Sequence, residues 1–501
     1  MAARLWIDVE DLFEYVRSNR RPSGIQRLAF EIYQTMQDHY GDTGLVHFVR
    51  HDVRRNSFRV VPWRDVTGLF EKLTELEVAP SIRLERGISP HPPGRQLMRR
   101  LVHRLTPSLR PALVDAALTL SEAFRAWGRL AVAVRHGTRS RLNRLALRIR
   151  SLAADRRRRR AGAQKLCSFA ECSRSGDVLL ALGAPWSHPD YSGLVRMQRE
   201  RGLRFALLVY DLIPVRRPEW FERDLVRLFR ACFESILPLC DMVFAISRAT
   251  ADDVEAYARE SGVALPGPVT PIPIGTGFGS QSQPAPTSHC RALPTASSYA
   301  LFVSTIEVRK NHTLLFRVWR RLLEDLPGER VPTLVFAGHI GWLVGDLMRQ
   351  IANTDHLNGK LVVIEDPTDA ELAMLYRGCL FTVFPSFHEG WGLPVTESLA
   401  FGKPCIISNR TSLPEAGGRL VRSFDPDNLH DAYQVIRQAI DDRRELARWE
   451  AEVRREFKPV PWSATVEAIL ARLDASPEAS SVLARPLRPE GSPAHNLTEN
   501  V

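Results

Sequence analysis

Two glutamates flank a glycine-rich turn in the segment FHEGWGLPVTES, residues 387–398. The hydrophobic stretch CLFTVFPS (379–386) leads into this turn, and Pro394 suits the first turn of the helix expected to follow, since no helix needs an amide hydrogen there. The turn therefore lies at the carboxyl edge of a sheet, where α/β proteins bind ligands, and the helix N-terminus favours an anion such as a diphosphate. We expect Glu389 to face a group attached beyond the phosphates, and Glu397 to reach sideways to neutral hydroxyls such as those of a ribose.

Two adjacent cations follow another predicted strand. Arg309 and Lys310 come just after YALFVST (299–305), the first strand of the half that carries the glutamates. An Arg-Lys pair alone is usually a surface feature, but this location favours a functional role. Two cations at a strand end can neutralise a phosphate, and they matter most when charge builds on a leaving group.

Three other patterns imitate catalytic motifs. DPD (425–427) has the form of a metal-binding D-x-D, but it precedes the helical pattern NLHDAYQVIRQAI and predicts a turn and a helix N-cap. GTGFGS (275–280) lacks the last glycine of a dinucleotide fingerprint and leads into a polar stretch. His388 has the chemistry of an acid or base, although a single loop histidine more often only forms hydrogen bonds.

The elements that must position these residues alternate between strands and helices. Near-continuous apolar runs are typical of strands buried on both faces of a parallel sheet. The strand candidates are 4–9, 177–182, 204–213, 241–247, 299–305, 333–338, 360–365, 379–386 and 403–408. Amphipathic helices lie between them, one of them after Gly24, so the fold class is α/β and doubly wound.

The 501 residues favour two to three domains, and a hydrophobic content of 44% allows large cores. The boundaries expected are a first domain over 1–275 with a helical insertion at about 85–165, a Gly/Ser/Pro/Thr linker over 276–298, a second domain over 299–458, a helix over 459–475 and a disordered tail over 476–501. The start of the chain does not have the pattern of a secretory signal, and no apolar run approaches the length of a membrane span. We expect a cytoplasmic protein whose seven scattered cysteines are reduced, with no metal site.

The net charge of +11 is concentrated in one segment. Residues 95–160 hold eighteen arginines against three acids, a local charge of +15. A basic amphipathic helix is typical of peripheral binding to the anionic inner face of a membrane, and a solvated basic face packed on its own domain explains the pattern equally well. Nucleic-acid binding has less support, because no aromatic platform accompanies the arginines. Deleting 95–160 distinguishes these hypotheses by the loss of vesicle flotation, of RNA affinity, or of neither.

The ordered set FVSTIEVRKNH, LVFAGHIGW, TDAELAMLYRGC and VFPSFHEGWGLPVTESLAFGKPCIIS resembles the retaining glycosyltransferases of family four, among them bacterial surface-polysaccharide enzymes. Glu389 and Glu397 match the E-x7-E motif of that family. The resemblance is strong over about 298–435 and weaker at VYDLIPVRRPEWF, FAISRATADDV and RPSGIQR. It implies a GT-B fold, in which two Rossmann-like domains face a cleft.

The resemblance also implies roles for single residues. Arg309 and Lys310 would hold the donor diphosphate, Glu397 the ribose, and Glu389 the donor sugar near the reacting carbon. Further residues would complete the donor side (Gly338, Ile364 with the loop that follows it, Gly392, Leu393 and Pro394) and the acceptor side (Gly24, Arg27, Tyr210 and Asp211). The family often has Gly at 304, Pro at 308 and His at 210, where this chain has Ser304, Val308 and Tyr210. These departures leave open the shape of the phosphate loop and the first-domain contact with the donor sugar.

The function implied is transfer of a hexose, with mannose favoured by resemblance alone, from a nucleotide diphosphate sugar to a hydroxyl of a glycan or lipid-linked oligosaccharide. The family implies retention of configuration and no metal or other cofactor, the nucleotide sugar being a substrate. An inverting enzyme would need a base in the first domain, for which Asp211 is the candidate. The alternative from another class is a non-catalytic GT-B protein that binds a sugar nucleotide or glycan as a scaffold.

Overall fold

The computed structural model describes residues 3–19, 21–52, 57–75, 169–187, 191–277 and 293–474. The predicted arginine-rich insertion and tail lie outside these residues, as does most of the predicted linker. Both sheets described below belong to one compact unit, Met1–Val78 with Ser168–Val501.

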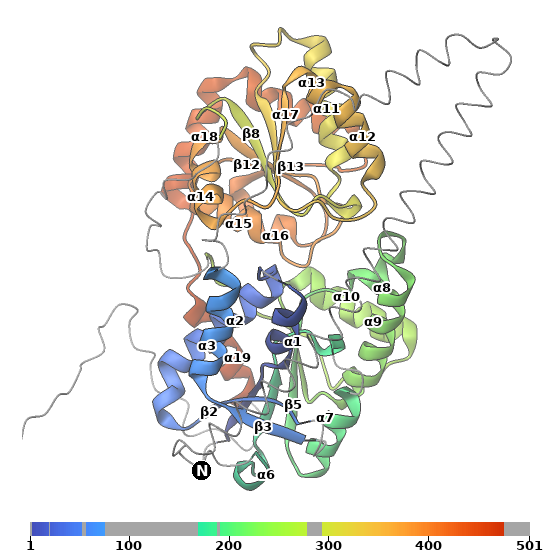
Figure 1. Ribbon diagram of the computed structural model, residues 1–501, viewed down its shortest axis with the longest axis vertical. Coiled ribbons are helices and arrows are strands. Elements are labelled where there is room, and N and C mark those ends of the chain that lie inside the picture. The colour runs from blue at the N-terminus through green and yellow to red at the C-terminus, as the bar shows by residue number, and fades with distance from the viewer. Residues whose placement is uncertain are drawn as a thin grey trace, which may run out of the picture. The chain divides into compact units, whose positions relative to one another are not determined.

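The first sheet has seven strands in the order β3-β2-β1-β4-β5-β6-β7. Its strands β2, β3 and β5 are labelled in Figure 1. All neighbours pair in parallel except β2 and β3, which are antiparallel. The strands are β1 (Leu5–Asp8), β2 (Val46–Asp52), β3 (Ser57–Val61), β4 (Val178–Ala181), β5 (Arg204–Val209), β6 (Met242–Ala245) and β7 (Thr270–Pro271). The strand order reverses between β1 and β4, so the switch point of this sheet lies at the carboxyl ends of these two strands.

Helices cover both faces of the first sheet because strand residues alternate between two cores. In β1, Ile7 packs with the α2 side and Trp6 with the α7 and α9 side. Ser23 caps α2, which buries Leu28, Ile32 and Met36 on one face as the spacing predicts. The helices are α1 (Glu10–Ser18), α2 (Gly24–Tyr40), α3 (Trp63–Glu75), α6 (Phe169–Cys172), α7 (Tyr191–Glu200), α8 (Ile213–Arg216), α9 (Arg223–Ile236) and α10 (Arg248–Ser261).

The second sheet has six strands, all parallel, in the order β10-β9-β8-β11-β12-β13. The strands are β8 (Tyr299–Val303), β9 (Thr333–Ala337), β10 (Leu361–Ile364), β11 (Phe381–Phe384), β12 (Cys405–Ser408) and β13 (Val421–Phe424). The strand order reverses between β8 and β11, the two strands that precede the cations and the glutamate turn. The chemistry predicted from the sequence therefore lies at the switch point of the second sheet.

Helices also cover both faces of the second sheet, since Phe302 and Leu301 of β8 lie in different cores. The helices are α11 (His312–Asp325), α12 (Gly345–Asn353), α13 (Asp355–Asn358), α14 (Asp369–Gly378), α15 (Leu393–Ala400), α16 (Leu413–Gly417), α17 (Leu429–Asp441), α18 (Arg443–Glu456) and α19 (Trp462–Asp474). The last of these packs into the core of the first sheet through Val466, Ile469 and Leu470. The doubly wound α/β fold class predicted from the sequence is confirmed, since two mainly parallel sheets each carry helices on both faces.

The state of the cysteines and the length of the helices bear on two further predictions. Cys172 is disulfide-bonded, so the prediction of reduced cysteines is wrong for this residue, whereas Cys232, Cys240, Cys379 and Cys405 are free thiols. Within the described ranges, no helix combines the length and apolar character that crossing a bilayer requires.

Candidate active site

Two loops meet at the switch point of the second sheet. After β8 the chain forms a short 3-10 turn, Val308–Lys310, and Asn311 then adopts the left-handed conformation with φ of 58°. The Asn311 amide donates to the carbonyls of Pro385 and Pro426, at 3.3 and 3.2 Å. The backbone amide of Phe387 donates to the Arg309 carbonyl at 3.0 Å. These bonds fix the cation turn against the loop that leaves β11.

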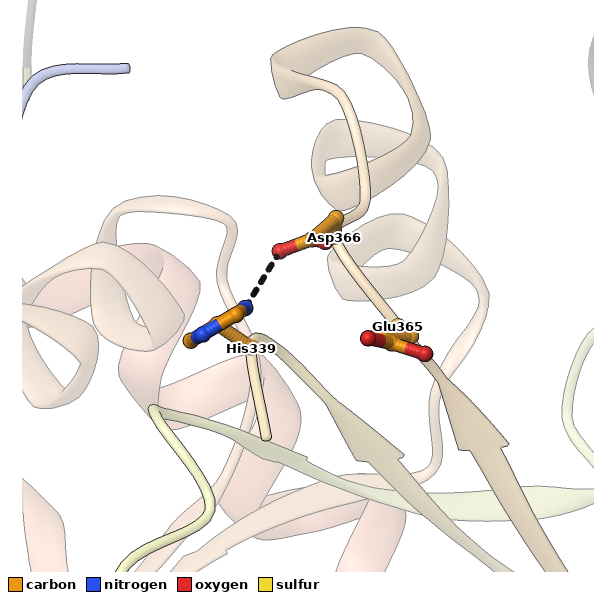
Figure 2. Close-up of side chains that lie close together, drawn as sticks. All are labelled: His339, Glu365 and Asp366. Atoms are coloured by element: carbon orange, nitrogen blue, oxygen red, sulfur yellow. Dashed lines mark hydrogen bonds and ion pairs between the residues drawn. The ribbon is translucent and has the colours of Figure 1, made fainter. Parts of the chain in front are cut away.

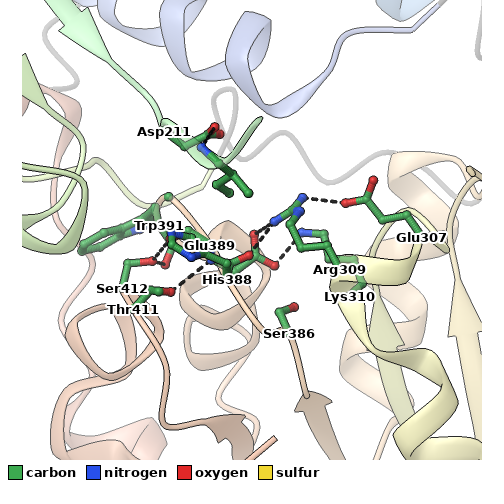
Figure 3. A network of polar contacts seen from close by, with 12 residues as sticks. Asp211, Glu307, Arg309, Lys310, Ser386, His388, Glu389, Trp391, Thr411 and Ser412 are labelled. Atoms are coloured by element: carbon green, nitrogen blue, oxygen red, sulfur yellow. Dashed lines mark hydrogen bonds and ion pairs between the residues drawn. The ribbon is translucent and has the colours of Figure 1, made fainter. Parts of the chain in front are cut away.

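The four charged side chains of this site form one network (Figure 3). Arg309 donates to Glu389 Oε2 at 2.7 Å and to Glu307 Oε1 at 2.6 Å, and Lys310 donates to Glu389 Oε1 at 2.6 Å. Arg309 also donates to the His388 carbonyl at 2.7 Å. The Glu389 carboxylate therefore lies between both cations. Glu307 is 2% exposed, and sequence analysis missed it because it was treated only as part of a loop.

The backbone around Glu389 is held from a neighbouring turn. The Glu389 amide donates to Thr411 Oγ1 at 3.0 Å. The Ser412 hydroxyl is 3.0 Å from the Glu389 carbonyl and 2.9 Å from that of Trp391. These two hydroxyl residues follow β12 and carry no sequence signal of their own, since short Ser and Thr side chains are common in turns.

Burial and neighbouring charges both shift the pKa values of Glu389, Lys310 and Arg309. Burial alone would raise the pKa of Glu389, but the nearby charges of Arg309 and Lys310 lower this pKa to about 2. Burial, together with the charge of Arg309, lowers the pKa of Lys310. The pKa of Arg309 lies above its ordinary value, since the charges of Glu389 and Glu307 outweigh its burial. At neutral pH Glu389 is therefore an anion facing two cations.

A depressed carboxylate pKa predicts how stability depends on pH. Glu389 contributes stability above its ordinary pKa of 4.5, and this contribution is lost as the pH falls through about 2. The advantage of the native chain over Glu389→Gln in free energy of unfolding should be on the order of 3 kcal/mol near pH 7 and shrink below pH 4.5. Urea unfolding at a series of pH values measures this difference.

The control for this experiment is Glu324→Gln, since Glu324 is a largely exposed acid of α11 paired only with Arg320. Its difference from the native chain should stay within about 0.5 kcal/mol at every pH. An advantage of Glu389 that persists unchanged down to pH 3 would contradict the charge arrangement described here.

The helix after the glutamate turn begins as predicted. Pro394 occupies its first turn, and Gly392 precedes it with φ of 103°, a conformation that favours glycine. A Cβ at Gly392 would also lie 2.6 Å from Leu413 Cδ2. Gly402 follows the end of the helix in the left-handed region, with φ of 69°. The amide end of α15 thus lies beside Glu389 in sequence and at the same sheet edge.

Glu397 projects from the second turn of α15. Its Oε2 accepts a hydrogen bond from the Tyr376 hydroxyl at 2.8 Å. Burial raises the pKa of Glu397, and the bond from Tyr376 lowers it only in part. The partner of Glu397 therefore lies outside the Arg309–Glu389–Lys310 network. That the two glutamates face different ligand groups stays a prediction.

The remaining donor-side residues lie at the ends of β9 and β10. Gly338 has φ of 155°, and a Cβ there would lie 2.0 Å from the Ser304 carbonyl oxygen, so the close approach of these two loops requires glycine. The Gly338 amide donates to the Ile364 carbonyl at 3.0 Å. The Ile364 side chain is buried in a core, so a ligand at this edge would meet the loop after it.

Of the predicted acceptor-side residues, three lie near residues of the second half of the chain, and Tyr210 is bonded within the first sheet. Gly24 lies against Leu393, with 3.5 Å between a built Cβ and Leu393 Cδ1, and Arg27 forms a two-bond ion pair with Asp369 at 2.9 Å. Asp211 is buried, which raises its pKa, and the charges of Arg309 and His388 oppose this rise. Tyr210 is different, because its hydroxyl donates to the Leu182 carbonyl at 2.6 Å inside the first sheet.

His388 and the DPD segment (425–427), which resemble catalytic motifs in the sequence, form local hydrogen bonds and ion pairs in the structure. His388 Nε2 lies 3.0 Å from Asp253 Oδ2. Asp425 and Asp427 both accept from Arg410, and Asn428 caps α17, so the predicted turn and helix start are confirmed. These residues therefore need no metal to explain their positions.

His339, Glu365 and Asp366 lie together at the ends of β9 and β10 (Figure 2). His339 Nδ1 is 3.2 Å from Asp366 Oδ1, and the His339 side chain is 65% exposed. Of the described residues, these are the group whose ligand atoms lie close enough to hold a metal ion. Exposed acidic groups of this kind are common in proteins without an ion, so the group supports no assignment.

Comparison with known proteins relates the second sheet to one family. Residues 291–456 match the family described as "Glycosyl transferases group 1". The chain is 28% identical over 253 residues to the O-antigen chain mannosyltransferase B of Escherichia coli, covering 49% of this chain and 64% of that protein. It is 25% identical over 294 residues to the serotype-specific mannosyltransferase WbdA of Escherichia coli, covering 57% of this chain and 35% of that protein.

A third relative is the D-inositol 3-phosphate glycosyltransferase of Thermobifida fusca, 32% identical over 193 residues, with 36% of this chain and 43% of that protein covered. The chain thus spans less than two thirds of each of these relatives. Among solved structures, TarM matches with a TM-score of 0.45 and 11% identity, covering 60% of this chain and 55% of TarM. Anabaena HepE in complex with UDP matches with a TM-score of 0.42 and 15% identity, covering 59% of this chain and 78% of HepE.

Proposed function

We propose that this chain, whose residues 291–456 match the group 1 glycosyl transferases, moves a hexose from a nucleotide diphosphate sugar to a hydroxyl of a glycan or lipid-linked oligosaccharide. The observation that carries this proposal is the pairing of Arg309 and Lys310 with Glu389 beside the amino end of α15. Mannose is the hexose favoured, because two of the relatives are described as mannosyltransferases.

The proposed step needs electrostatic stabilisation above all. The bond between the anomeric carbon and the phosphate oxygen breaks, and its electron pair stays on the departing nucleoside diphosphate. Arg309, Lys310 and the amides that begin α15 stabilise this new negative charge. The acceptor oxygen forms the new bond to the anomeric carbon on the same face, and its proton passes to the departing phosphate. Glu389 binds the donor sugar next to the reacting carbon.

The donor nucleotide extends from this point along the sheet edge. Gly392, Leu393 and Pro394 present backbone to the phosphates, and Glu397 accepts from the ribose hydroxyls. Gly338 and the loop after Ile364 lie next to the base. The acceptor enters from the first domain, near Gly24, Arg27 and Asp211. Tyr210 does not contact the donor sugar in this proposal, since its hydroxyl is already bonded.

A screen of nucleotide sugars by thermal unfolding tests the proposal. One nucleoside diphosphate hexose at a hundred times its Kd should raise the unfolding temperature by about 3 °C, since binding then stabilises the fold by about 2.7 kcal/mol. Adding EDTA should leave this rise unchanged, because both charge-stabilising side chains belong to the chain. The best ligand should then be consumed as a donor, and binding without turnover would favour a scaffold. The absence of any stabilising nucleotide sugar would contradict the proposal.

Peripheral binding to the inner membrane face through residues 95–160 stays a prediction. Those residues lie outside the part of the chain that the structure describes. A lipid-linked acceptor is the reason for proposing it, since such an acceptor resides at a membrane surface.

A further inference from the structure

The switch point of the first sheet holds a second polar site, which sequence analysis missed. A cavity of about 10 Å³ lies where β1 and β4 end, enough for one group the size of a water molecule. Its lining includes Asp8, Glu10, Asp11, His51, Gly183 and Tyr191. Open α/β sheets bind ligands at this kind of position, and here it carries buried carboxylates instead of cations.

Two of the three acids have partners within the protein. Asp8 Oδ2 accepts from the Tyr191 hydroxyl at 2.7 Å and lies 2.9 Å from His51 Nε2. Glu10 accepts two bonds from Arg50, at 2.7 and 3.0 Å, and one from the His51 amide at 2.8 Å. Asp8 thus links the end of β1 to β2 and α7, and Glu10 links the start of α1 to β2. These bonds account for the burial of both acids.

Asp11 has no such explanation. It is 7% exposed, and neither of its carboxylate oxygens has a donor in full hydrogen-bond geometry, although the amides of Leu12 and Ala184 and the Gln26 side chain lie near enough to act on its charge. Gly183 makes room for it, because a Cβ at 183 would lie 2.2 Å from Asp11 Cγ. Burial and the charge of Asp8 raise the pKa of Asp11 to about 7. A buried carboxylate that lacks a well-formed hydrogen bond costs stability, and such a cost is typical of a group kept for a ligand.

We propose that Asp11 accepts a hydrogen bond from a hydroxyl of the acceptor, a neutral polyhydroxylated glycan. This inference rests on the proposed function and adds a specific acceptor-binding residue to it. The cavity fits a single hydroxyl, and a carboxylate oxygen is an acceptor only. Asp11 already feels the charge of Asp8, so a further anion beside it is disfavoured. A metal fits less well, since within the described ranges only His339, Glu365 and Asp366 bring ligand atoms close enough together.

The position of Asp11 agrees with an acceptor role. Its charge acts on the Tyr210 hydroxyl at the end of β5, which is the neighbour of β4 in the sheet. The next residue, Asp211, is within range of the charges of Arg309, His388 and Glu389. The cavity and the donor network are thus linked by two adjacent residues of one strand end.

Binding of simple glycosides tests the assignment. Saturation-transfer NMR with the full chain and a panel of methyl hexosides, each near 50 mM, should detect at least one ligand. Asp11→Asn should weaken that ligand at least tenfold, because an amide replaces one acceptor oxygen by a donor. In the native chain affinity should rise as the pH increases through about 7, where Asp11 ionises, and in Asp11→Asn it should be flat.

Two further variants sharpen the experiment. Gly183→Ala should displace the carboxylate without removing it and weaken the glycoside to a similar degree. Glu14→Gln, on the same helix but paired with Arg17, is the matched control and should bind like the native chain. Asp11→Asn should unfold at or above the native temperature at pH 8, since a buried charge is removed.

The outcomes separate the two proposals. Unchanged glycoside binding in Asp11→Asn, or no glycoside binding to the native chain, overturns the assignment of Asp11 alone. A lower unfolding temperature with equal losses of glycoside and nucleotide affinity means that Asp11 is structural, which also overturns it. Failure of every nucleotide sugar to bind the native chain contradicts the proposed function instead.

Discussion

Replacing Lys310 by alanine should lower kcat/KM for sugar transfer by about two to three orders of magnitude, the loss expected when one charge-stabilising donor is removed. Lys310 donates to Glu389 at 2.6 Å and is 15% exposed, so it is held at the site and shielded from water. In the proposed reaction its ammonium stabilises the departing diphosphate, a charge that develops only in the transition state. The loss should therefore fall mainly on kcat, measured as release of nucleoside diphosphate with and without acceptor.

Arg330→Ala is the control for this variant. Arg330 is a half-exposed cation of the same domain, paired with Asp441 at 3.0 Å, and its removal should change kcat/KM less than twofold. Transfer by Lys310→Ala within threefold of the native rate would mean that the leaving group lies elsewhere. Donor turnover by the native chain that disappears in Lys310→Ala and Glu389→Ala would also exclude the scaffold alternative.

Glu397→Gln should weaken nucleotide binding about 10- to 100-fold, as expected for hydrogen bonds to a charged group. The variant keeps the shape of the side chain and the bond from Tyr376, but replaces one acceptor oxygen by a donor. Titration calorimetry with GDP and UDP measures the change. Tyr376→Phe should cause a smaller loss, because the carboxylate stays and only its fixed position is relaxed.

Binding of deoxynucleotides tests whether the affinity lost in Glu397→Gln comes from contact with the ribose. Removing the ribose hydroxyl that Glu397 binds should weaken binding to the native chain about tenfold and should cause little further loss in Glu397→Gln. Equal and additive losses would mean that Glu397 contacts another part of the nucleotide. Native affinity in Glu397→Gln would remove Glu397 from the binding site.

The strand-turn-helix order of the second half could be predicted from sequence, because apolar strands, glycines and Pro394 each have strong local preferences. These preferences put Arg309, Lys310 and Glu389 at one sheet edge. Their mutual pairing could not be predicted, since it depends on the left-handed turn at Asn311 and on the 3-10 turn before it. Glu307 was missed for the same reason.

The polar site of the first sheet could not be predicted from the sequence for a different reason. The acids of WIDVED stand at the end of a predicted strand, which was a usable signal. Their surroundings, however, come from distant parts of the chain: His51 lies 43 residues after Asp8, and Tyr191 lies 183 residues after it. Tyr210 shows the converse: the family resemblance placed it on the acceptor side, where the family often has His, while its hydroxyl donates to the Leu182 carbonyl within the first sheet.

The Glu389 carboxylate acts as a built-in counter-ion. Arg309 and Lys310 are paired with Glu389 and Glu307, so two basic side chains contact two acidic ones. A small anion such as inorganic phosphate should bind weakly to Arg309 and Lys310, because it must displace the Glu389 carboxylate that already contacts them. A nucleotide sugar brings further contacts along the sheet edge to offset that exchange. Selectivity against abundant small anions therefore follows from this arrangement, and phosphate at 10 mM should compete poorly with the donor.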